Sequence, residues 1–187
     1  MHPAIEDDDA DWLDPHCTVT NGERFAALHT VATALFAELA QTYAVTSVAT
    51  LDAVGNDMPT RNLRPPITLY PDGGGAPLAV VFTTEASVLL RVGWWYREGF
   101  PFCSCDGCAL TVAAVAQRLR ERCAAVVAGE FQEEIETRPV WHGMAFSRFS
   151  FGAGRSQSAL PAAEALRLRA GLPERSTWAP WVRRAPG

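Results

Sequence analysis

The sequence contains no lysine, and all 16 of its basic residues are arginine, which we attribute to genomic composition bias. No basic stripe stands out, and this absence argues against a nucleic-acid-binding surface. No uninterrupted apolar run approaches the roughly 20 residues that span a bilayer. The acidic start of the chain also lacks the apolar segment of a secretory signal. We therefore expect a cytoplasmic protein with no nucleic-acid partner and no membrane partner.

Common catalytic and cofactor motifs are also missing. The chain has no G-x-S-x-G elbow, no H-E-x-x-H pair and no G-x-G-x-x-G stretch after a strand. The glycine-rich stretch PDGGGA at 71–76 lacks the Lys and Ser/Thr of a phosphate-binding loop. The five cysteines are an odd number, which fits poorly with a closed disulfide framework. The cysteines therefore become the main chemical feature of the chain.

The composition is that of an ordinary globular protein, with 187 residues, 48% hydrophobic and 20% charged. The net charge of −5 is concentrated at one end, because six of the 21 acidic residues lie in the first 14 positions. The remaining acids nearly balance the 16 arginines. We expect an acidic, irregular segment over 1–19, followed by a single domain over 20–187.

Helical periodicity is clear in two places. Thr20 and Glu23 form a capping-box pattern, and apolar residues at helical spacing follow as far as Tyr43. A second helix is predicted over about 107–128, with Asp106 as its N-cap, Cys108 on its apolar stripe and Gly129 after its end. Cys123 lies on the same stripe, where a free cysteine behaves as a small core residue.

Between and after these helices the sequence predicts strands over 43–51, 67–70, 77–84 and 87–98, and a strand or tight hairpin over 139–151. The stretch 53–66 and the stretch 152–158 read as loops, and 161–170 reads as a short helix. Trp178 and Trp181 are expected to hold down the C-terminal tail. This order predicts an α+β fold, with an antiparallel sheet of about four to six strands and two long helices packed against it.

The stretch FPFCSCDGCAL at 100–110 places Cys103, Cys105 and Cys108 within six positions. A turn of this kind brings three thiols together, and thiolates are preferred ligands of zinc. Structural zinc sites have four protein ligands. We predict His142 as the fourth, while His16, Cys17 or a water molecule could take that position instead.

Two other interpretations of the cysteines stay open. Cys105 and Cys108 form a C-x2-C pair at a predicted helix start, where a thiol pKa is lowered and redox chemistry is favoured. The thiols could also be reduced residues that only pack. Glu98 precedes the cluster and could support a metal site. We predict a zinc-stabilised module that contacts a protein or small-molecule partner, and the alternative is an enzyme with a zinc site or thiol redox chemistry.

The chain resembles an uncharacterised bacterial family, known only as a domain of unknown function. The resemblance rests on a T-N-x-E-R-F helix start, an R-x-G-x-W strand, an F-P-x-C-x-C-D-x-C turn and a Trp-rich tail that ends in arginine. It covers most of the chain after residue 18, and the cysteine turn is its most specific part. The matching residues are Thr20, Asn21, Glu23, Arg24, Phe25, Arg91, Gly93, Trp95, Phe100, Pro101, Cys103, Cys105, Asp106 and Cys108.

Overall fold

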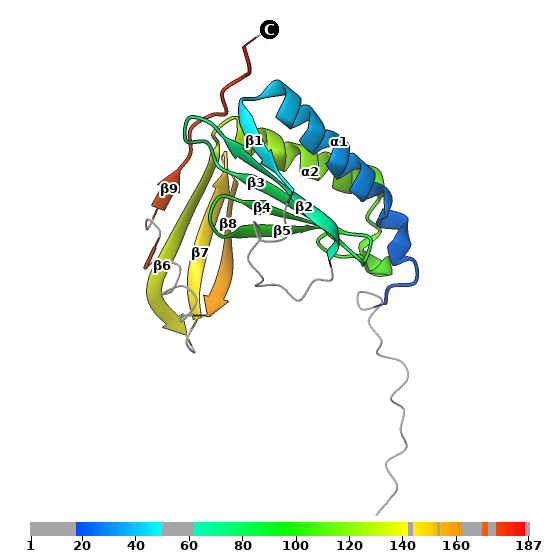
Figure 1. Ribbon diagram of the computed structural model, residues 1–187. Coiled ribbons are helices and arrows are strands. Elements are labelled where there is room, and N and C mark those ends of the chain that lie inside the picture. Colours follow the sequence, from blue (N-terminus) through cyan, green and yellow to red (C-terminus); the bar gives the residue numbers. More distant parts are fainter. Residues whose placement is uncertain are drawn as a thin grey trace, which may run out of the picture.

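The computed structural model describes residues 18–49, 62–141, 144–152, 154–161, 170–171 and 175–185. Over these residues the chain forms two α-helices and two antiparallel sheets. Both helices cover one face of the larger sheet, and the smaller sheet stands beside it (Figure 1). The predicted α+β fold is confirmed. No helix among the described residues combines the length and the apolar character needed to cross a membrane.

The larger sheet has five strands, and each pairs with the next strand in the chain. Its strands are β1 (Val45–Val48), β2 (Asn62–Pro71), β3 (Leu78–Thr83), β4 (Val88–Val92) and β5 (Tyr96–Phe100). Cross-strand pairs such as Val80–Leu90 and Phe82–Val88 place apolar residues on one face of the sheet. These side chains are buried in the core beneath the helices. The loop predicted over 53–66 is too long, because residues 62–66 already belong to β2 and this part of the strand pairs with β3.

Helix α1 (Ala27–Thr42) and helix α2 (Val112–Val127) supply the other half of this core. Residues 22–25 form a 3-10 turn before α1, and no side chain caps that helix, so the capping box predicted at Thr20 is wrong. Helix α2 begins later than predicted. Its cap is Thr111, whose Oγ1 accepts a hydrogen bond from the Ala114 amide at 3.2 Å.

The smaller sheet has the strand order β8-β7-β6-β9. Its strands are β6 (Phe131–Trp141), β7 (Met144–Phe151), β8 (Gly154–Pro161) and β9 (Arg175–Thr177). The predicted hairpin over 139–151 is confirmed, although β6 starts earlier. The loop predicted over 152–158 is wrong, because β8 pairs with β7 at the edge of the sheet, where polar residues are well tolerated. Most of the helix predicted over 161–170 lies outside the described residues.

A tight turn at Gly93–Trp95 divides the strand predicted over 87–98 into β4 and β5. Gly93 has a φ of 60°, a left-handed conformation that glycine adopts easily. The backbone amides of Trp94 and Trp95 donate hydrogen bonds, at 2.9 and 3.3 Å, to the carboxylate of Glu133 on β6. The prediction of one strand over 87–98 is wrong, because a side chain from the other sheet stabilises the turn by accepting its backbone amides.

Aromatic contacts and the C-terminal tail complete the packing. The ring of Tyr96 lies 4.7 Å from that of Phe149, which joins the two sheets. Trp181 is buried, and its Nε1 donates to the Ala76 carbonyl at 3.0 Å. Trp178 packs on Trp94 with ring centroids 5.1 Å apart. The prediction that these two tryptophans hold the tail down is confirmed.

Candidate metal centre

The three clustered cysteines lie on the loop between β5 and α2. This loop contains one 3-10 turn, η3 (Asp106–Cys108). Cys103 and Cys105 precede that turn, and Cys108 is its last residue. Ala109 has a φ of 47°, so the chain turns away there before Thr111 begins α2. The prediction that Cys108 sits on the apolar stripe of the long helix, with Asp106 as its cap, is therefore wrong.

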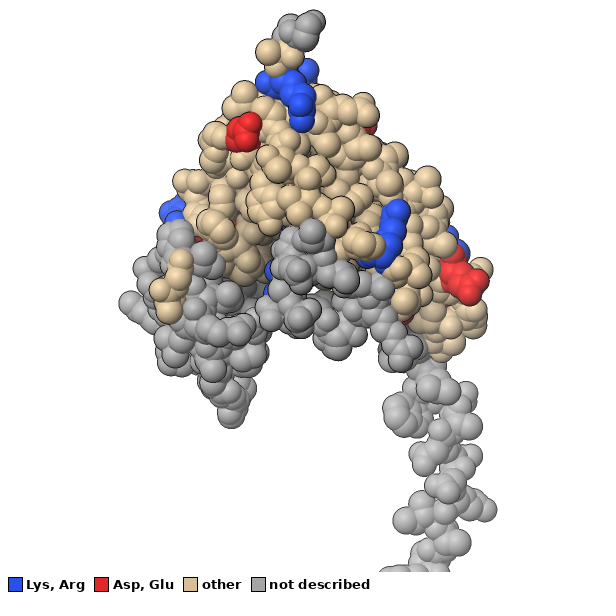
Figure 2. Space-filling view, in the orientation of Figure 1, with Lys and Arg blue, Asp and Glu red and all other residues tan. Residues whose placement is uncertain are grey.

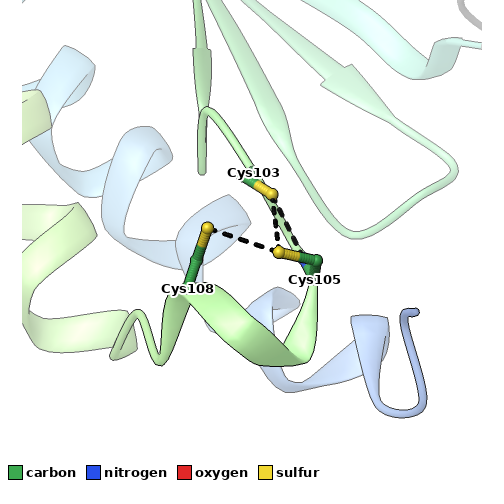
Figure 3. Close-up of side chains that lie close together, drawn as sticks. All are labelled: Cys103, Cys105 and Cys108. Carbon is green, nitrogen blue, oxygen red and sulfur yellow. Dashed lines mark hydrogen bonds between the residues drawn. The ribbon is translucent and has the colours of Figure 1, made fainter. Parts of the chain in front are cut away.

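The loop brings the three sulfur atoms together, as predicted. Cys105 Sγ lies 3.0 Å from Cys103 Sγ and 3.3 Å from Cys108 Sγ. All three sulfur atoms lie within 4.8 Å of one another. Figure 3 shows the three side chains directed toward one another, with dashed lines that link Cys105 to each of the other two. Cys105 is buried, while the other two are half-buried, so the cluster is accessible from one side.

The segment that precedes α1 holds this loop in place. The backbone amide of Asp106 donates to the Thr18 carbonyl at 2.9 Å, and the Asp106 carboxylate accepts from the Thr20 amide at 3.1 Å. Arg24 donates from Nη2 to the carbonyls of Ser104 and Cys105 at 2.9 and 3.3 Å. The motif residues near position 20 therefore support the cysteine loop.

The pKa values of Cys103 and Cys108 are shifted in opposite directions. The pKa of Cys103 lies below its ordinary value because of its hydrogen bond with the Cys105 thiol and because its sulfur accepts the Cys105 backbone amide. The pKa of Cys108 is raised to about 12, chiefly because its hydrogen bonds with Cys105 and Cys103 favour the protonated thiol.

The cluster has the dimensions and the chemistry of a thiolate metal site. A Zn–S bond is about 2.3 Å, so tetrahedral zinc separates its sulfur ligands by about 3.8 Å. The observed separations of 3.0 and 3.3 Å reach this value with sulfur movements of less than about an ångström. Binding replaces the thiol protons with the ion. The cysteine triad is therefore geometrically able to hold a metal ion.

The other predicted site residues divide into two groups. His142, His16 and Cys17 lie outside the described residues. Cys123 is buried in the helix–sheet core, as predicted, and burial raises the pKa of its thiol to about 12.

Glu98 does not support the cysteines. Its carboxylate instead accepts hydrogen bonds from Arg118 at 2.7 Å, from Arg122 at 2.8 Å and from the Tyr96 hydroxyl. The interpretation of Glu98 as a partner of the metal site is therefore wrong. Its role is to order two arginines of α2 above β5.

Glu133 is a buried carboxyl group that the sequence did not lead us to predict. It is 1% exposed, and burial raises the pKa of its carboxyl to about 7, although two backbone amides donate to it. The signal in the sequence is its spacing, because Glu133 lies two positions after Phe131 on a strand and so shares its buried face.

Together these features define a two-sheet α+β protein with a three-cysteine centre between β5 and α2. The model of a family of unknown function, DUF6226, matches residues 7–185. The chain belongs to this family. No curated protein and no solved structure matches it.

Proposed function

We propose that Cys103, Cys105 and Cys108 bind one zinc ion, and that the protein is a zinc-stabilised module that acts by contacting a partner. The observation that carries this function is the convergence of three sulfur atoms within 4.8 Å. Soft thiolate ligands favour zinc among the common divalent ions of the cell. The free thiols suit a reducing compartment, and we place the protein in the cytoplasm.

The surroundings of the cluster favour an organising role over a catalytic one. The loop has little regular structure of its own, and its backbone is held by Thr18, Thr20 and Arg24. A bound ion would add a further restraint, because it would hold the three cysteine side chains of the loop together. Among the described residues, no cysteine lines the apolar pocket that adjoins the loop. A structural zinc site is closed by four protein ligands, whereas a catalytic one faces an open cleft.

The fourth ligand is proposed from the residues that adjoin the loop. The Thr18 carbonyl accepts the Asp106 amide at 2.9 Å, and Cys17 is bonded directly to Thr18 in the sequence. This connection along the chain supports Cys17 as the proposed fourth ligand. His142, predicted from the sequence, is the alternative fourth ligand.

The partner is proposed to be a protein or a small molecule rather than nucleic acid. On the face shown in Figure 2, the arginine and acidic side chains of the described residues stand apart and do not form a basic patch. A nucleic-acid surface needs clustered positive charge to neutralise phosphates.

Metal analysis of protein purified without added metal tests the zinc site. We expect about one zinc per chain in the wild type and a loss in Cys105→Ser. Cys123→Ala is the matched control, because it removes a buried thiol away from the cluster and leaves the zinc content unchanged. Less than half a zinc per chain, unchanged in Cys105→Ser, would contradict the proposed site.

Chelator competition distinguishes the fourth ligand. Loss of a ligand weakens zinc binding, so we expect Cys17→Ser to lose at least about tenfold in affinity and His142→Gln to retain it. The reverse result would assign His142. Equal affinity in the wild type and both variants would leave water in the fourth position and favour a catalytic site.

Thiol redox chemistry is a second candidate function, and one observation favours it. Cys103 has a lowered pKa, and its sulfur lies 3.0 Å from Cys105 Sγ. The closer pair is thus Cys103–Cys105, rather than the C-x2-C pair of Cys105 and Cys108. Mild oxidation followed by disulfide mapping tests this function, and the absence of a reversible disulfide among the three cysteines counts against it.

A further inference from the structure

An apolar pocket lies between the cysteine loop and the first turns of α2. Its volume is about 160 Å³. Seven of its eight lining residues are apolar or glycine, and they come from the end of β5, the loop and α2. The lining residues are Gly99, Phe100, Pro101, Phe102, Leu110, Ala114, Val115 and Arg118.

The pocket is large enough for one aromatic ring, and an aromatic side chain lies at its rim. An apolar cavity of about 150 Å³ in another protein holds benzene. The Phe102 side chain is 61% exposed, which is unusual for phenylalanine and places an apolar surface beside the opening. Phe100 is buried and closes the interior. The pocket therefore fits a ligand whose body, meaning its apolar part, is a single aromatic ring or a short branched alkyl group.

One charged group, Arg118, lines this pocket and is held in a fixed position. Its Nε and Nη2 both donate to Glu98 Oε1, at 3.0 and 2.7 Å. Its guanidinium carbon lies 5.4 Å from the centre of the Phe102 ring. Within the described residues, Nη1 makes no hydrogen bond, and 46% of the side chain is exposed. Arg118 can therefore donate to a further acceptor at the pocket without first giving up Glu98.

The charges around Arg118 favour an anionic acceptor. Glu98 also accepts from Arg122 and from the Tyr96 hydroxyl, so two arginines share one carboxylate. Glu121, an acidic neighbour on α2, accepts from Gln117 instead. Arginine presents paired N–H donors that match a carboxylate.

We propose that this pocket binds a small carboxylate whose body is one aromatic ring or a short branched alkyl group. The body fills the apolar interior against Phe100, Leu110 and Val115, and the carboxylate meets Arg118 at the opening. This combination of an apolar cavity and one placed polar group is typical of small-molecule sites. The site does not depend on the proposed zinc ion, because no lining residue is a cysteine.

A ligand-observed NMR titration of the full chain with 3-phenylpropanoate tests this site. We expect saturation transfer from the protein to the ring, with a Kd on the order of 1 mM for a ligand of this size. The neutral analogue 3-phenylpropanamide should bind at least about fivefold more weakly, because it lacks the charge that Arg118 recognises. Acetate should not compete, because it lacks the apolar body.

Two substitutions on the exposed side of α2 provide a matched pair. Ala114 lines the pocket, whereas Ala113 beside it does not, and both are exposed. We expect Ala114→Leu to fill the cavity and raise the Kd of 3-phenylpropanoate at least tenfold, and Ala113→Leu to leave it unchanged. Arg118→Gln should weaken the binding of 3-phenylpropanoate to the affinity of the amide, and it should leave the affinity of the amide unchanged.

Circular dichroism of each variant confirms that it folds before its affinity is compared. Equal affinities of the acid and the amide for the wild type would overturn the role of Arg118. No saturation transfer at 5 mM ligand, or an equal effect of Ala114→Leu and Ala113→Leu, would overturn the site itself.

Discussion

Replacement of Glu133 by glutamine tests the carboxyl group that joins the two sheets. In the folded protein this group is buried and accepts the backbone amides of Trp94 and Trp95. Its pKa rises from an ordinary value of 4.5 to about 7, chiefly because burial disfavours the charged form. Glutamine keeps the size of the side chain and one acceptor oxygen but carries no charge at any pH.

The sign of the effect follows from proton binding. The folded state holds the Glu133 proton more tightly than the unfolded chain does, so unfolding releases a proton between about pH 4.5 and pH 7. Stability contributed by this group is therefore lost as the pH rises through this window. At about 1.4 kcal/mol for each pH unit, the loss between pH 5 and pH 8 is about 2 to 3 kcal/mol. Glu133→Gln removes this loss.

Urea unfolding followed by tryptophan fluorescence measures the effect at pH 5, 6, 7 and 8. We expect the free energy of unfolding of Glu133→Gln, relative to the wild type, to rise by about 2 to 3 kcal/mol from pH 5 to pH 8. Glu134→Gln is the control, because Glu134 is the next residue on β6 and points to the other face of the sheet. A wild-type-to-variant difference that stays constant across this range would refute the role assigned to Glu133.

Substitutions at three further positions test local features of the fold. Cys123→Ala should cost about 1 to 2 kcal/mol in urea unfolding, because it leaves a small cavity in the core. Cys108→Ala should cost more in zinc-loaded protein, because it also removes a ligand; equal costs would mean that Cys108 only packs. Thr111→Ala should cost about 1 kcal/mol and lower the Tm by a few degrees, because it removes the cap of α2, whereas Thr111→Ser should restore most of the stability. A Tm of Thr111→Ala equal to that of the wild type would show that the cap contributes nothing.

Local patterns in the sequence predicted the elements whose stabilising contacts are also local. The stripe of α1 was found because Leu28, Phe36 and Leu39 recur at helical spacing and share one buried face. The divided strand at Gly93 was missed because the group that stabilises the turn, Glu133, is 40 positions away in the chain. Strand β8 was missed because an edge strand needs no alternation of apolar residues.

The cysteine cluster shows the same division between local and distant information. Spacing alone predicted that three thiols meet, because a turn of six residues leaves them little room to separate. It did not predict the role of Asp106, which binds the Thr18 and Thr20 backbone instead of capping a helix. Nor did it predict that Glu98 is held by two arginines of α2, since these partners are 20 and 24 residues away.

The C-terminal segment has a consequence for how the chain folds. Residues 175–177 form an edge of the smaller sheet, Trp181 fills the core, and Arg184 donates to the Tyr43 carbonyl at the end of α1 at 2.9 Å. These contacts span up to 141 residues of sequence, and such long loops close slowly. Before residues 175–184 dock, the Tyr43 carbonyl lacks its hydrogen bond from Arg184, and the site of Trp181 stays open. Chains that have not yet docked this segment therefore expose apolar surface of the kind that chaperones bind.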